Sequence, residues 1–488
     1  SEILNRLWSG KAIAWDAITD SIFKKEWRNH SAEVFADAWS NLNQLESINF
    51  ESRLVPLNKV HPQIPSRKDM RPIVINSPIV KLIEAGFLAD LNEYMVHKLH
   101  PSQTGFVQGN GIFVNLHRAI RRIRIRTSNK QRCFGVFVDF SSAYNTLDHE
   151  KLFQRLHPIL GSTKTNVIQA LYSKIKIRLG KETITPNQGV AQGSLTSPAL
   201  FNIYSEDLLS TLETQNQTSY EDILAYADDI LVICSDLQQV KMSIDWIRKW
   251  SEQNNMKLNE KKSGIVEFLS RRMKTTLKGT AYNDFPVCKE YKYLGLRLTN
   301  KLSMESQINH IKQTTHCIFH KLSPFLYKAE LDTRKSLWQV FIQPLIEFLL
   351  PLYIWESSKT NIQRANSIIR GSFKIFTGLK KNTPNAIIDL LSGYHILERG
   401  WLVEQISLDK WVSRTKGQTY LYENLSKGIQ NLLNLRRKNS CKCMPKELIQ
   451  YINLSTTICS SCKTPNTFKH LRTKHNFPVP DIETILKN

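Results

Sequence analysis

The chain has 488 residues, which is enough for two or three domains with a sizeable hydrophobic core. It carries 66 Lys and Arg residues against 43 Asp and Glu residues, and the formal net charge of +23 is typical of proteins that bind a polyanion. No apolar stretch reaches the roughly 20 residues of a membrane span, no secretory or transit segment opens the sequence, and the eight cysteines do not form a disulfide pattern. We therefore expect an intracellular protein without a membrane partner, in the nucleus, with the mitochondrion and the cytoplasm as alternatives.

The first informative element is a basic segment in the first third of the chain. Apolar residues recur at helical spacing from Ile112 to Ile125, so the pattern predicts a helix with arginines along one side. Such a row of cations attracts phosphate groups irrespective of base sequence, although a solvated helix face would give the same pattern. The arginines expected to bind nucleic acid are Arg118, Arg121, Arg122, Arg124 and Arg126.

Two apolar strand patterns then end in acidic residues. The run from Cys133 to Val138 leads into Asp139, and apolar runs flank Tyr226-Ala227-Asp228-Asp229 on both sides. The second pattern predicts strand, tight turn and strand, with two acids at the tip. Because unpaired buried carboxylates are costly, acids between core strands indicate bound cations, and two divalent ions held in this way serve in-line phosphoryl transfer. A strand-end cap at Asp139 and an ordinary acidic turn are the alternatives.

A loop between the two acidic segments has the composition of a ligand-binding turn. It runs from Asn187 to Pro198 and contains Gln192-Gly193-Ser194. Glycine permits a close approach of the backbone to a ligand, and Pro198 suits the first turn of the helix that is predicted to follow. A loop of this composition is also common in purely structural positions.

The order and spacing of these three segments resemble the palm motifs of reverse transcriptases, and the chain resembles one branch in particular, the non-LTR retrotransposon (LINE-like) reverse transcriptases. The resemblance extends from about Lys11 to about Gly295 and continues more weakly beyond. Lys11–Asp16 is similar to the amino-terminal signature of that family, and Arg71–Ile73 and Gln103–Phe106 are similar to its fingers motif and the loop after it. Leu258–Ser263 is similar to its lysine-bearing motif, and Tyr291–Gly295 is similar to its primer-grip hairpin.

The resemblance implies a centre that holds two Mg²⁺ ions, or Mn²⁺ in their place. The expected ligands are the side chains of Asp139, Asp228 and Asp229, with the backbone carbonyl of Phe140 contributing. Asp229 is the less certain direct ligand of the adjacent pair, because neighbouring residues in a tight hairpin point to different sides.

The same resemblance assigns residues to the incoming dNTP. The ring of Tyr144 would clash with a 2′-hydroxyl and so exclude ribonucleotides. Arg71 would pair with the triphosphate, because its guanidinium fork suits phosphate. Lys262 would protonate the leaving pyrophosphate, with the adjacent Lys261 as an alternative. The remaining expected dNTP contacts are Lys59, Phe140 and Gln192.

Two cysteines and two histidines near the carboxy terminus have the spacing C-x2-C-x7-H-x4-H. Two thiolates and two imidazoles would close a tetrahedral site for one structural Zn²⁺, and many non-LTR elements carry a similar zinc knuckle at this position. Unrelated surface residues in a polar tail are the alternative, and Cys441 and Cys443 could contribute instead. The expected ligands are Cys459, Cys462, His470 and His475.

We therefore expect an α+β fold of the right-hand polymerase type, with fingers, palm and thumb, an antiparallel palm sheet, a helical carboxy-terminal region and a small zinc knuckle. The expected parts are an amino-terminal extension and fingers (1–135), a palm (133–298) with an inserted fingers or helical segment at about 151–185, a helical thumb (300–400), and a helical and basic linker with the zinc knuckle at 459–475 (401–488).

The resemblance predicts an RNA-directed DNA polymerase that extends a primer 3′-hydroxyl with dNTPs on an RNA template, in target-primed reverse transcription. Its partners would be template RNA, a DNA primer or target, dNTPs and an additional protein that supplies an endonuclease, because no nuclease motif is visible in the chain. The alternatives are an RNA-binding or splicing scaffold with a reverse transcriptase fold, an RNA-dependent RNA polymerase and a telomerase-like enzyme. The intact acids argue against the scaffold, and Tyr144 argues against the RNA polymerase.

Overall fold

The computed structural model of the chain describes residues 50–60, 63–66, 69–270, 273–353, 358–394 and 396. The amino-terminal signature, the region 401–488 and the four predicted zinc ligands (Cys459, Cys462, His470 and His475) lie outside the described residues. The chain divides into two compact units. The first unit comprises Ser1–Ile112, Phe134–Ile265 and Gly279–Val287, and the second comprises Phe113–Cys133, Val266–Lys278 and Cys288–Asn488.

The first unit is built around an antiparallel sheet with the strand order β6-β7-β3-β8. β3 pairs with β7, and β6 and β7 form a hairpin in which Tyr226 is opposite Asp229. All residues of β3 and all residues of β7 after Asp229 are buried, which is why these continuous apolar runs form central strands. The bounds are β3 Cys133–Val138, β6 Ile223–Tyr226, β7 Asp229–Cys234 and β8 Gly264–Phe268. The predicted strands, the tight turn and the antiparallel sheet are thereby confirmed.

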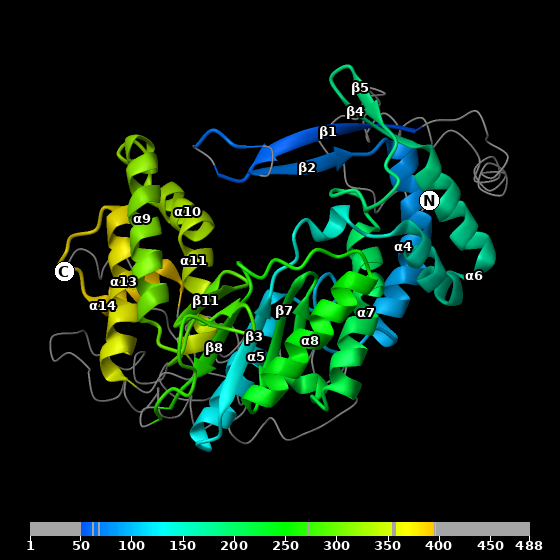
Figure 1. Cartoon of the computed structure of the whole chain (residues 1–488). Helices are drawn as coiled ribbons and strands as arrows, with labels where there is room; N and C mark the ends of the chain where they lie inside the picture. The colour runs from blue at the N-terminus through cyan, green and yellow to red at the C-terminus, as the bar shows by residue number, and fades with distance from the viewer. Residues whose placement is uncertain are drawn as a thin grey trace, which may run out of the picture. The chain divides into compact units, whose positions relative to one another are not determined.

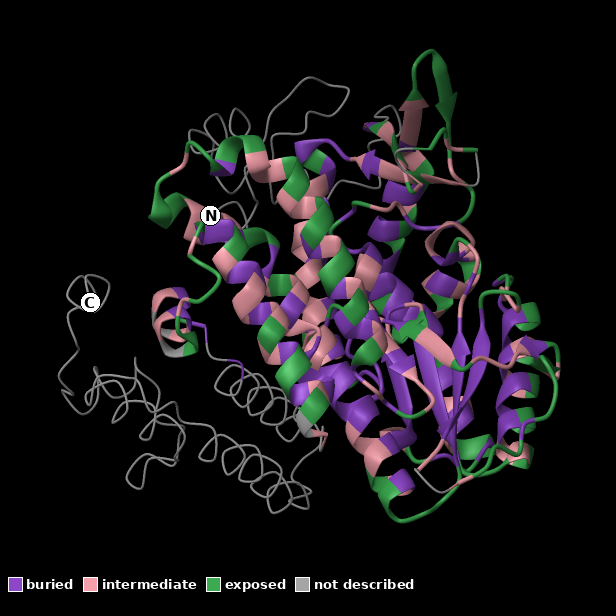
Figure 2. Ribbon diagram, turned by 90° about the vertical axis from the view of Figure 1, so that its left-hand side faces the viewer, coloured by how far each residue is buried: buried purple, intermediate pink, exposed green. Residues whose placement is uncertain are grey.

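Helices with one apolar face cover this sheet. α7 packs against β6 and α8 against β7, and Figure 1 shows both helices beside the sheet. Along α8 the buried residues Val240, Ile244 and Ile247 recur at the helical period, and in Figure 2 the strands and the inner helix faces are purple. The helices of this unit are α4 Pro78–His97, α6 His149–Lys174, α7 Ser197–Gln215 and α8 Leu237–Gln253, with short turns η3 Ala143–Asn145 and η4 Tyr220–Asp222 and a hairpin of β9 Ala281–Tyr282 and β10 Phe285–Pro286.

A second sheet of the first unit has the strand order β2-β1-β4-β5. β1 pairs antiparallel with β2 and parallel with β4. β4 and β5 form a hairpin, so the segment predicted at about 151–185 as an inserted fingers or helical segment is helical to Lys174 and continues as two strands. From Ile175 apolar and basic residues alternate up to a turn at Gly180, which is the period of a strand. The bounds are β1 Phe50–Asn58, β2 Met70–Ile75, β4 Ile175–Leu179 and β5 Glu182–Ile184.

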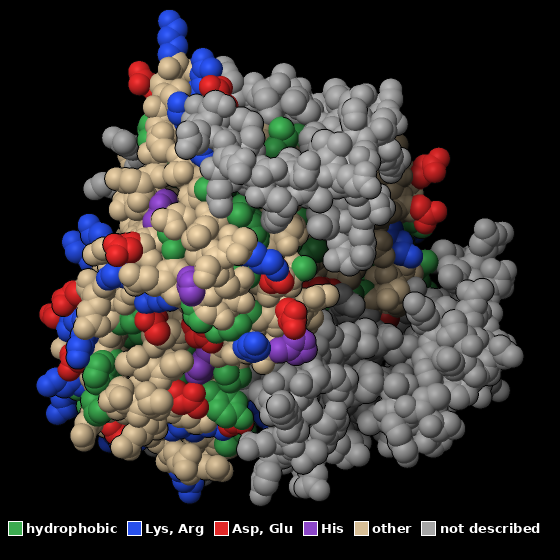
Figure 3. Space-filling model, turned by 90° about the vertical axis from the view of Figure 1, so that its right-hand side faces the viewer, with side chains coloured by type: hydrophobic (Ala, Val, Ile, Leu, Met, Phe, Trp, Pro, Cys, Tyr) green, Lys and Arg blue, Asp and Glu red, His purple; other side chains and the backbone are tan. Residues whose placement is uncertain are grey.

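Charged side chains are mixed on the face of the molecule drawn in Figure 3. The β4–β5 hairpin projects at the top of that view and carries blue basic side chains, in keeping with its sequence. Over the rest of the coloured surface, acidic and basic side chains alternate. Among the coloured residues on this face, the basic side chains therefore do not form one patch.

The second unit is mainly helical in its described part. α13 packs against α9, α10 and α14. Trp338 of α10 is fully buried, its Nε1 donates to the Ser372 hydroxyl at 3.0 Å, and its ring meets that of Phe373 edge-on with 5.2 Å between centroids. The elements are α5 Ile112–Ser128, β11 Glu290–Tyr293, β12 Leu296–Thr299, α9 Glu305–Leu326, α10 Leu331–Phe341, α11 Gln343–Glu347, α12 Leu350–Tyr353, α13 Lys359–Thr377 and α14 Asn385–Ser392. Helical structure is thus confirmed for the described residues of 300–400.

The apolar segment from Ile342 to Tyr353 contributes several side chains to the core of this unit. Ile346, Leu349 and Leu350 are all 0% exposed. In the ranges that the structure describes, no helix combines the length and the apolar character needed to cross a bilayer.

Candidate active site

The three predicted acids lie at one end of the central sheet. The register of β3 with β7 pairs Val138 with Ile230, and continuing it by one residue brings Asp139 level with Asp229. Asp228 occupies the turn that precedes Asp229. One strand end and one hairpin turn therefore bring the three acids to the same place, as the sequence predicts.

The carboxylates at this end of the sheet disfavour one another's charge. Burial, followed by the negative charges of Asp228 and Asp139, raises the pKa of Asp229 to about 7. Burial is also the main cause that raises the pKa of Asp228; a backbone hydrogen bond opposes the rise, the charge of Asp139 adds to it, and the charge of Arg71 opposes it with a smaller effect. None of the three acids forms an ion pair with a lysine or arginine of the described part of the chain. Negative charge therefore collects here with no lysine or arginine of the described ranges in direct contact.

This set of side chains fits a hard divalent cation. Carboxylate oxygens are the ligands that Mg²⁺ prefers, and a bound cation would reverse the rise in their pKa. Over the described ranges, no three His, Cys, Asp or Glu side chains are grouped closely enough to hold a metal ion by themselves. Oxygens of substrate phosphates would have to complete the shell, and ligation by Asp139, Asp228, Asp229 and the Phe140 carbonyl stays a prediction.

Tyr144, the predicted sugar gate, lies near the acids in η3. Its ring stacks on that of Phe201, with centroids 5.0 Å apart and an interplanar angle of 18°. Burial and then the charge of Asp228 raise the pKa of the Tyr144 hydroxyl, which places this side chain in the field of the acidic turn. Packing of the aromatic ring is confirmed, and exclusion of a 2′-hydroxyl stays a prediction.

The loop with Gln192 is held close to β2. The N–H of Val74 donates to the Gln192 carbonyl at 2.7 Å. Gly193 has φ +113°, and a Cβ at this position would lie 2.5 Å from the Val74 carbonyl oxygen. Glycine is therefore required here, because any side chain would push the loop away from the strand.

Glu84 on α4 holds the same loop and was not identified from the sequence. Its side chain is 2% exposed, Oε2 accepts from the Leu195 N–H at 3.1 Å, and Oε1 accepts from the Ser194 hydroxyl. Burial raises the pKa of Glu84, and these hydrogen bonds oppose the rise. A glutamate in a helix gives no sequence signal for such a role, because its hydroxyl partner is 110 residues away.

The basic residues predicted to act on the triphosphate or the pyrophosphate differ in how strongly their charges affect the three acids. The charge of Arg71 opposes the pKa rise of Asp228, as noted above, so Arg71 lies within electrostatic reach of the turn. Burial raises the pKa of Asp139, and the charge of Lys262 opposes this rise, which favours Lys262 over Lys261 as the lysine beside the acids. Lys59 is exposed, and its N–H donates to the Asp69 carbonyl at 2.9 Å within the β1–β2 connection.

The segment that carries Lys262 is hydrogen-bonded to the end of β3. The N–H of Asn259 donates to the Asp139 carbonyl at 2.8 Å, and the N–H of Asp139 donates to the Ser263 hydroxyl at 3.1 Å. The Asn259 side chain also bonds to Asp139 and helps to lower its pKa. These contacts keep Lys262 next to the first acid.

The predicted basic face of α5, in the second unit, is only partly accessible. Every residue from Val114 to Ile120 is buried, so this part of the helix has no solvent face. Arg118 is 7% exposed, so little of its side chain is accessible in this structure, and nucleic-acid binding by it stays a prediction. Arg124 Nη2 donates to the Leu302 carbonyl at 2.9 Å. Nucleic-acid binding stays a prediction for Arg121, Arg122, Arg124 and Arg126.

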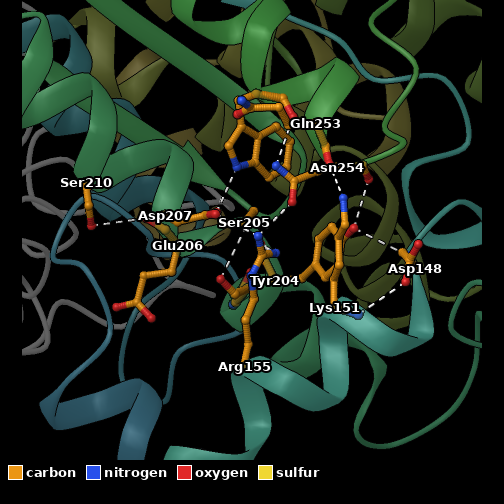
Figure 4. A network of polar contacts seen from close by, with 12 residues as sticks. Asp148, Lys151, Arg155, Tyr204, Ser205, Glu206, Asp207, Ser210, Gln253 and Asn254 are labelled. Carbon is orange, nitrogen blue, oxygen red and sulfur yellow. Dashed lines mark hydrogen bonds and ion pairs between the residues drawn. The ribbon is translucent and has the colours of Figure 1, made fainter.

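A polar network connects α6, α7 and α8, the helices that follow the segments with Asp139, with Gln192 and with Asp228 and Asp229 (Figure 4). Arg155 of α6 points toward α7 and the end of α8, and it donates to Asp207 at 2.6 Å and to Asn254 at 2.7 Å. Trp250 Nε1 donates to the same Asp207 at 2.8 Å, and the Tyr204 hydroxyl donates to the Asn254 carbonyl at 2.8 Å. These bonds fix α6, α7 and α8 to one another and so limit the movement of the segments before them.

Comparisons with known proteins point to one family. Residues 58–298 match the family described as reverse transcriptase (RNA-dependent DNA polymerase). Over 272 residues, the chain is 25% identical to the RNA-directed DNA polymerase from mobile element jockey of Drosophila melanogaster. This alignment covers 51% of this chain and 29% of that protein. Over 254 residues, the chain is 26% identical to the retrovirus-related Pol polyprotein from type-2 retrotransposable element R2DM of Drosophila melanogaster. This alignment covers 48% of this chain and 24% of that protein.

Among solved structures, telomerase from Candida albicans in complex with a fragment of telomeric RNA aligns with a TM-score of 0.44 and 10% identity, over 92% of this chain and 72% of that chain. The chain spans about a third of the length of the curated relatives it matches.

Proposed function

Through residues 58–298 the chain belongs to the reverse transcriptase family, of the non-LTR retrotransposon type, and from this premise we propose that it extends a primer 3′-hydroxyl with dNTPs on an RNA template. The observation that carries the proposal is the meeting of Asp139, Asp228 and Asp229 at one end of an antiparallel sheet, where burial and mutual repulsion raise the pKa of Asp228 and Asp229. Such a cluster is costly until cations and phosphate-bearing substrates bind to it.

Asp139, Asp228 and Asp229, together with the Phe140 carbonyl, would hold the two Mg²⁺ ions. When bound, two such ions supply activation of the attacking hydroxyl and neutralisation of charge on the leaving pyrophosphate. With a pKa near 7, Asp229 carries a proton in part of the population at neutral pH. Cation binding would release that proton, and the affinity for Mg²⁺ would therefore increase as the pH rises.

Other residues of the first unit would bind and orient the dNTP. Tyr144 would exclude the 2′-hydroxyl from the side of the acidic turn, and Gln192 would contact the nucleotide from a loop fixed by Val74. Arg71 and Lys59 would bind the triphosphate. Lys262, held beside Asp139, would protonate the leaving pyrophosphate.

The right-hand layout belongs to the same proposal. The β2-β1-β4-β5 sheet would form fingers, the β6-β7-β3-β8 sheet the palm, and α9 to α14 the thumb. The partners would be template RNA and a DNA primer at a nuclear target, with an endonuclease supplied by another protein for target-primed synthesis. One structural Zn²⁺ would be bound by Cys459, Cys462, His470 and His475.

A primer-extension assay on an RNA template tests the proposal. Asp228→Asn keeps the shape of the side chain and removes its charge, so dNTP incorporation should fall on the order of 1,000-fold while RNA affinity stays close to normal. Asp245→Asn is the matched control, because Asp245 is an exposed acid on α8 of the same unit, and this variant should retain activity. Near-normal incorporation by Asp228→Asn would show that the acids are not the catalytic centre.

A further inference from the structure

Gln103 makes two hydrogen bonds to one backbone residue of the acidic turn. It lies in the loop after α4 and is 0% exposed. Its Oε1 accepts from the N–H of Ala227 at 2.8 Å, and its Nε2 donates to the carbonyl of the same residue at 3.2 Å. Ala227 immediately precedes Asp228, so the Gln103 side chain holds the backbone of the residue from which Asp228 and Asp229 follow.

Ala227 is in a backbone conformation that a non-glycine residue rarely adopts. Its φ is +52°, in the left-handed region, where the Cβ crowds the following carbonyl. The residue persists in this conformation only if its surroundings hold it there. The two bonds from Gln103 satisfy the N–H and the carbonyl of Ala227 in this orientation, and they would be lost if the turn relaxed to a negative φ.

The loop of Gln103 is itself attached to the hairpin. Gln103 pairs with Ala225 in a β-bridge, the Thr104 N–H donates to the Ala225 carbonyl at 2.9 Å, and the Ala225 N–H donates to the Ser102 carbonyl at 3.0 Å. A Cβ on Gly105 would overlap the nitrogen of Ala227, so glycine is needed for this close approach. The loop therefore pairs with β6 at one isolated β-bridge, which places the Gln103 amide at the turn.

We propose that Gln103 is a positioning residue that orients Asp228 and Asp229 by holding Ala227 in the left-handed conformation. A side-chain amide is suited to this task because it presents an acceptor and a donor side by side, which match a backbone N–H and carbonyl. The role rests on the proposed function, since the acids need a fixed orientation only if they hold the ions used in catalysis.

The test compares Gln103→Met with the unmodified chain in primer extension. Methionine has a similar length and no amide, so the two bonds to Ala227 are lost with little change in volume. We expect kcat to fall on the order of 10- to 100-fold and the Mg²⁺ concentration for half-maximal activity to rise several-fold, as for a small misplacement of catalytic groups. Affinity for primer–template should change little, whereas the melting temperature should fall, because the buried N–H and carbonyl of Ala227 lose their partners. Gln239→Met is the matched control, because it removes amide hydrogen bonds at the opposite end of β7.

A second substitution separates orientation of the turn from general support of the fold. Glycine adopts a positive φ without strain, so adding Ala227→Gly to Gln103→Met should restore part of kcat and of the Mg²⁺ dependence. Partial recovery supports the proposed role. The role is overturned if Gln103→Met keeps the kcat and Mg²⁺ dependence of the unmodified chain, or if its activity falls in parallel with its melting temperature and Ala227→Gly restores neither.

The parent proposal fails separately. If Asp228→Asn still extends primers, the acids are not catalytic and both proposals fall. If Asp228→Asn is inactive and Gln103→Met is normal, only the positioning role is lost.

Discussion

At the β6–β7 turn, Asp228 and Asp229 stand beside Asp139 and repel it, whereas Glu84, a buried carboxylate of the same unit, accepts hydrogen bonds from the Ser194 hydroxyl and the Leu195 N–H. Burial raises the pKa in both regions, but like charges add to the rise at the turn and hydrogen bonds oppose it at Glu84. The comparison separates two uses of an acidic side chain, because Glu84 is buried, whereas Asp228 is half-buried and Asp229 is exposed. Donors from the protein make Glu84 part of the structure, and their scarcity at the turn leaves negative charge for a ligand to neutralise.

The largest expected effect is from Asp139→Asn, which should reduce primer extension on the order of 1,000-fold while raising the melting temperature of the metal-free protein. The gain follows because burial and charge repulsion disfavour ionised carboxylates at the sheet end. Thermal unfolding in the presence of a chelator, beside activity on the same preparation, measures both. A lower melting temperature would mean that Asp139 is a structural acid like Glu84.

Glu84→Gln should have a smaller effect on activity and the opposite effect on stability. Glutamine replaces one accepting oxygen by an NH2 donor, so the bonds from the Ser194 hydroxyl and the Leu195 N–H cannot both be accepted as before, which should cost about 1–3 kcal/mol of unfolding free energy. We expect incorporation to fall about tenfold, mainly through a higher KM for dNTP, because the Gln192 loop loses an anchor. Urea unfolding and steady-state kinetics measure the two effects.

Glu93→Gln provides the control for Glu84, because Glu93 is an exposed residue of the same helix α4. Its unfolding free energy and KM should be unchanged. If the Glu84 and Glu93 variants were equally stable, the buried hydrogen bonds would not anchor the loop.

The smallest expected effect is on the pH dependence of stability. The pKa of Asp229 is about 7 in the folded chain against an ordinary value of 3.8, so the folded state holds its proton more tightly than the unfolded state. The stability contributed by this group is fully present below about pH 4 and is lost as the pH rises to about 7. The residue retains solvent contact, which limits the size of the effect.

Melting temperatures from pH 4 to pH 8 measure this contribution. Asp229→Asn should remove part of the decline that the unmodified chain shows with rising pH, and Mg²⁺ should reduce the decline in the unmodified chain alone. Identical pH profiles for the two proteins would contradict the assigned pKa rise.

The acidic turn and its strands were predictable because their signals are local. The apolar runs before Asp139 and around Asp228 have the length of buried strands, and acids at the end of such runs are visible without knowledge of the fold. Helical structure beyond residue 300 was predictable for the same reason. The hairpin after Lys174 also has a local signal, because apolar and basic residues alternate from Ile175 up to the turn at Gly180.

Short-range periodicity and turn chemistry specify β3, β6 and β7, the turn between β6 and β7, and the acids at that turn. In contrast, the hydrogen bonds of Gln103 to Ala227 (124 residues apart) and of Ser194 to Glu84 (110 residues apart), and the burial of Arg118, depend on how the elements pack together. The residues next to a glutamine, a glutamate or an arginine in the sequence do not indicate which distant residue it will contact or whether it will be buried. These features depend on which elements pack together, and packing depends on the burial of apolar surface over the whole unit.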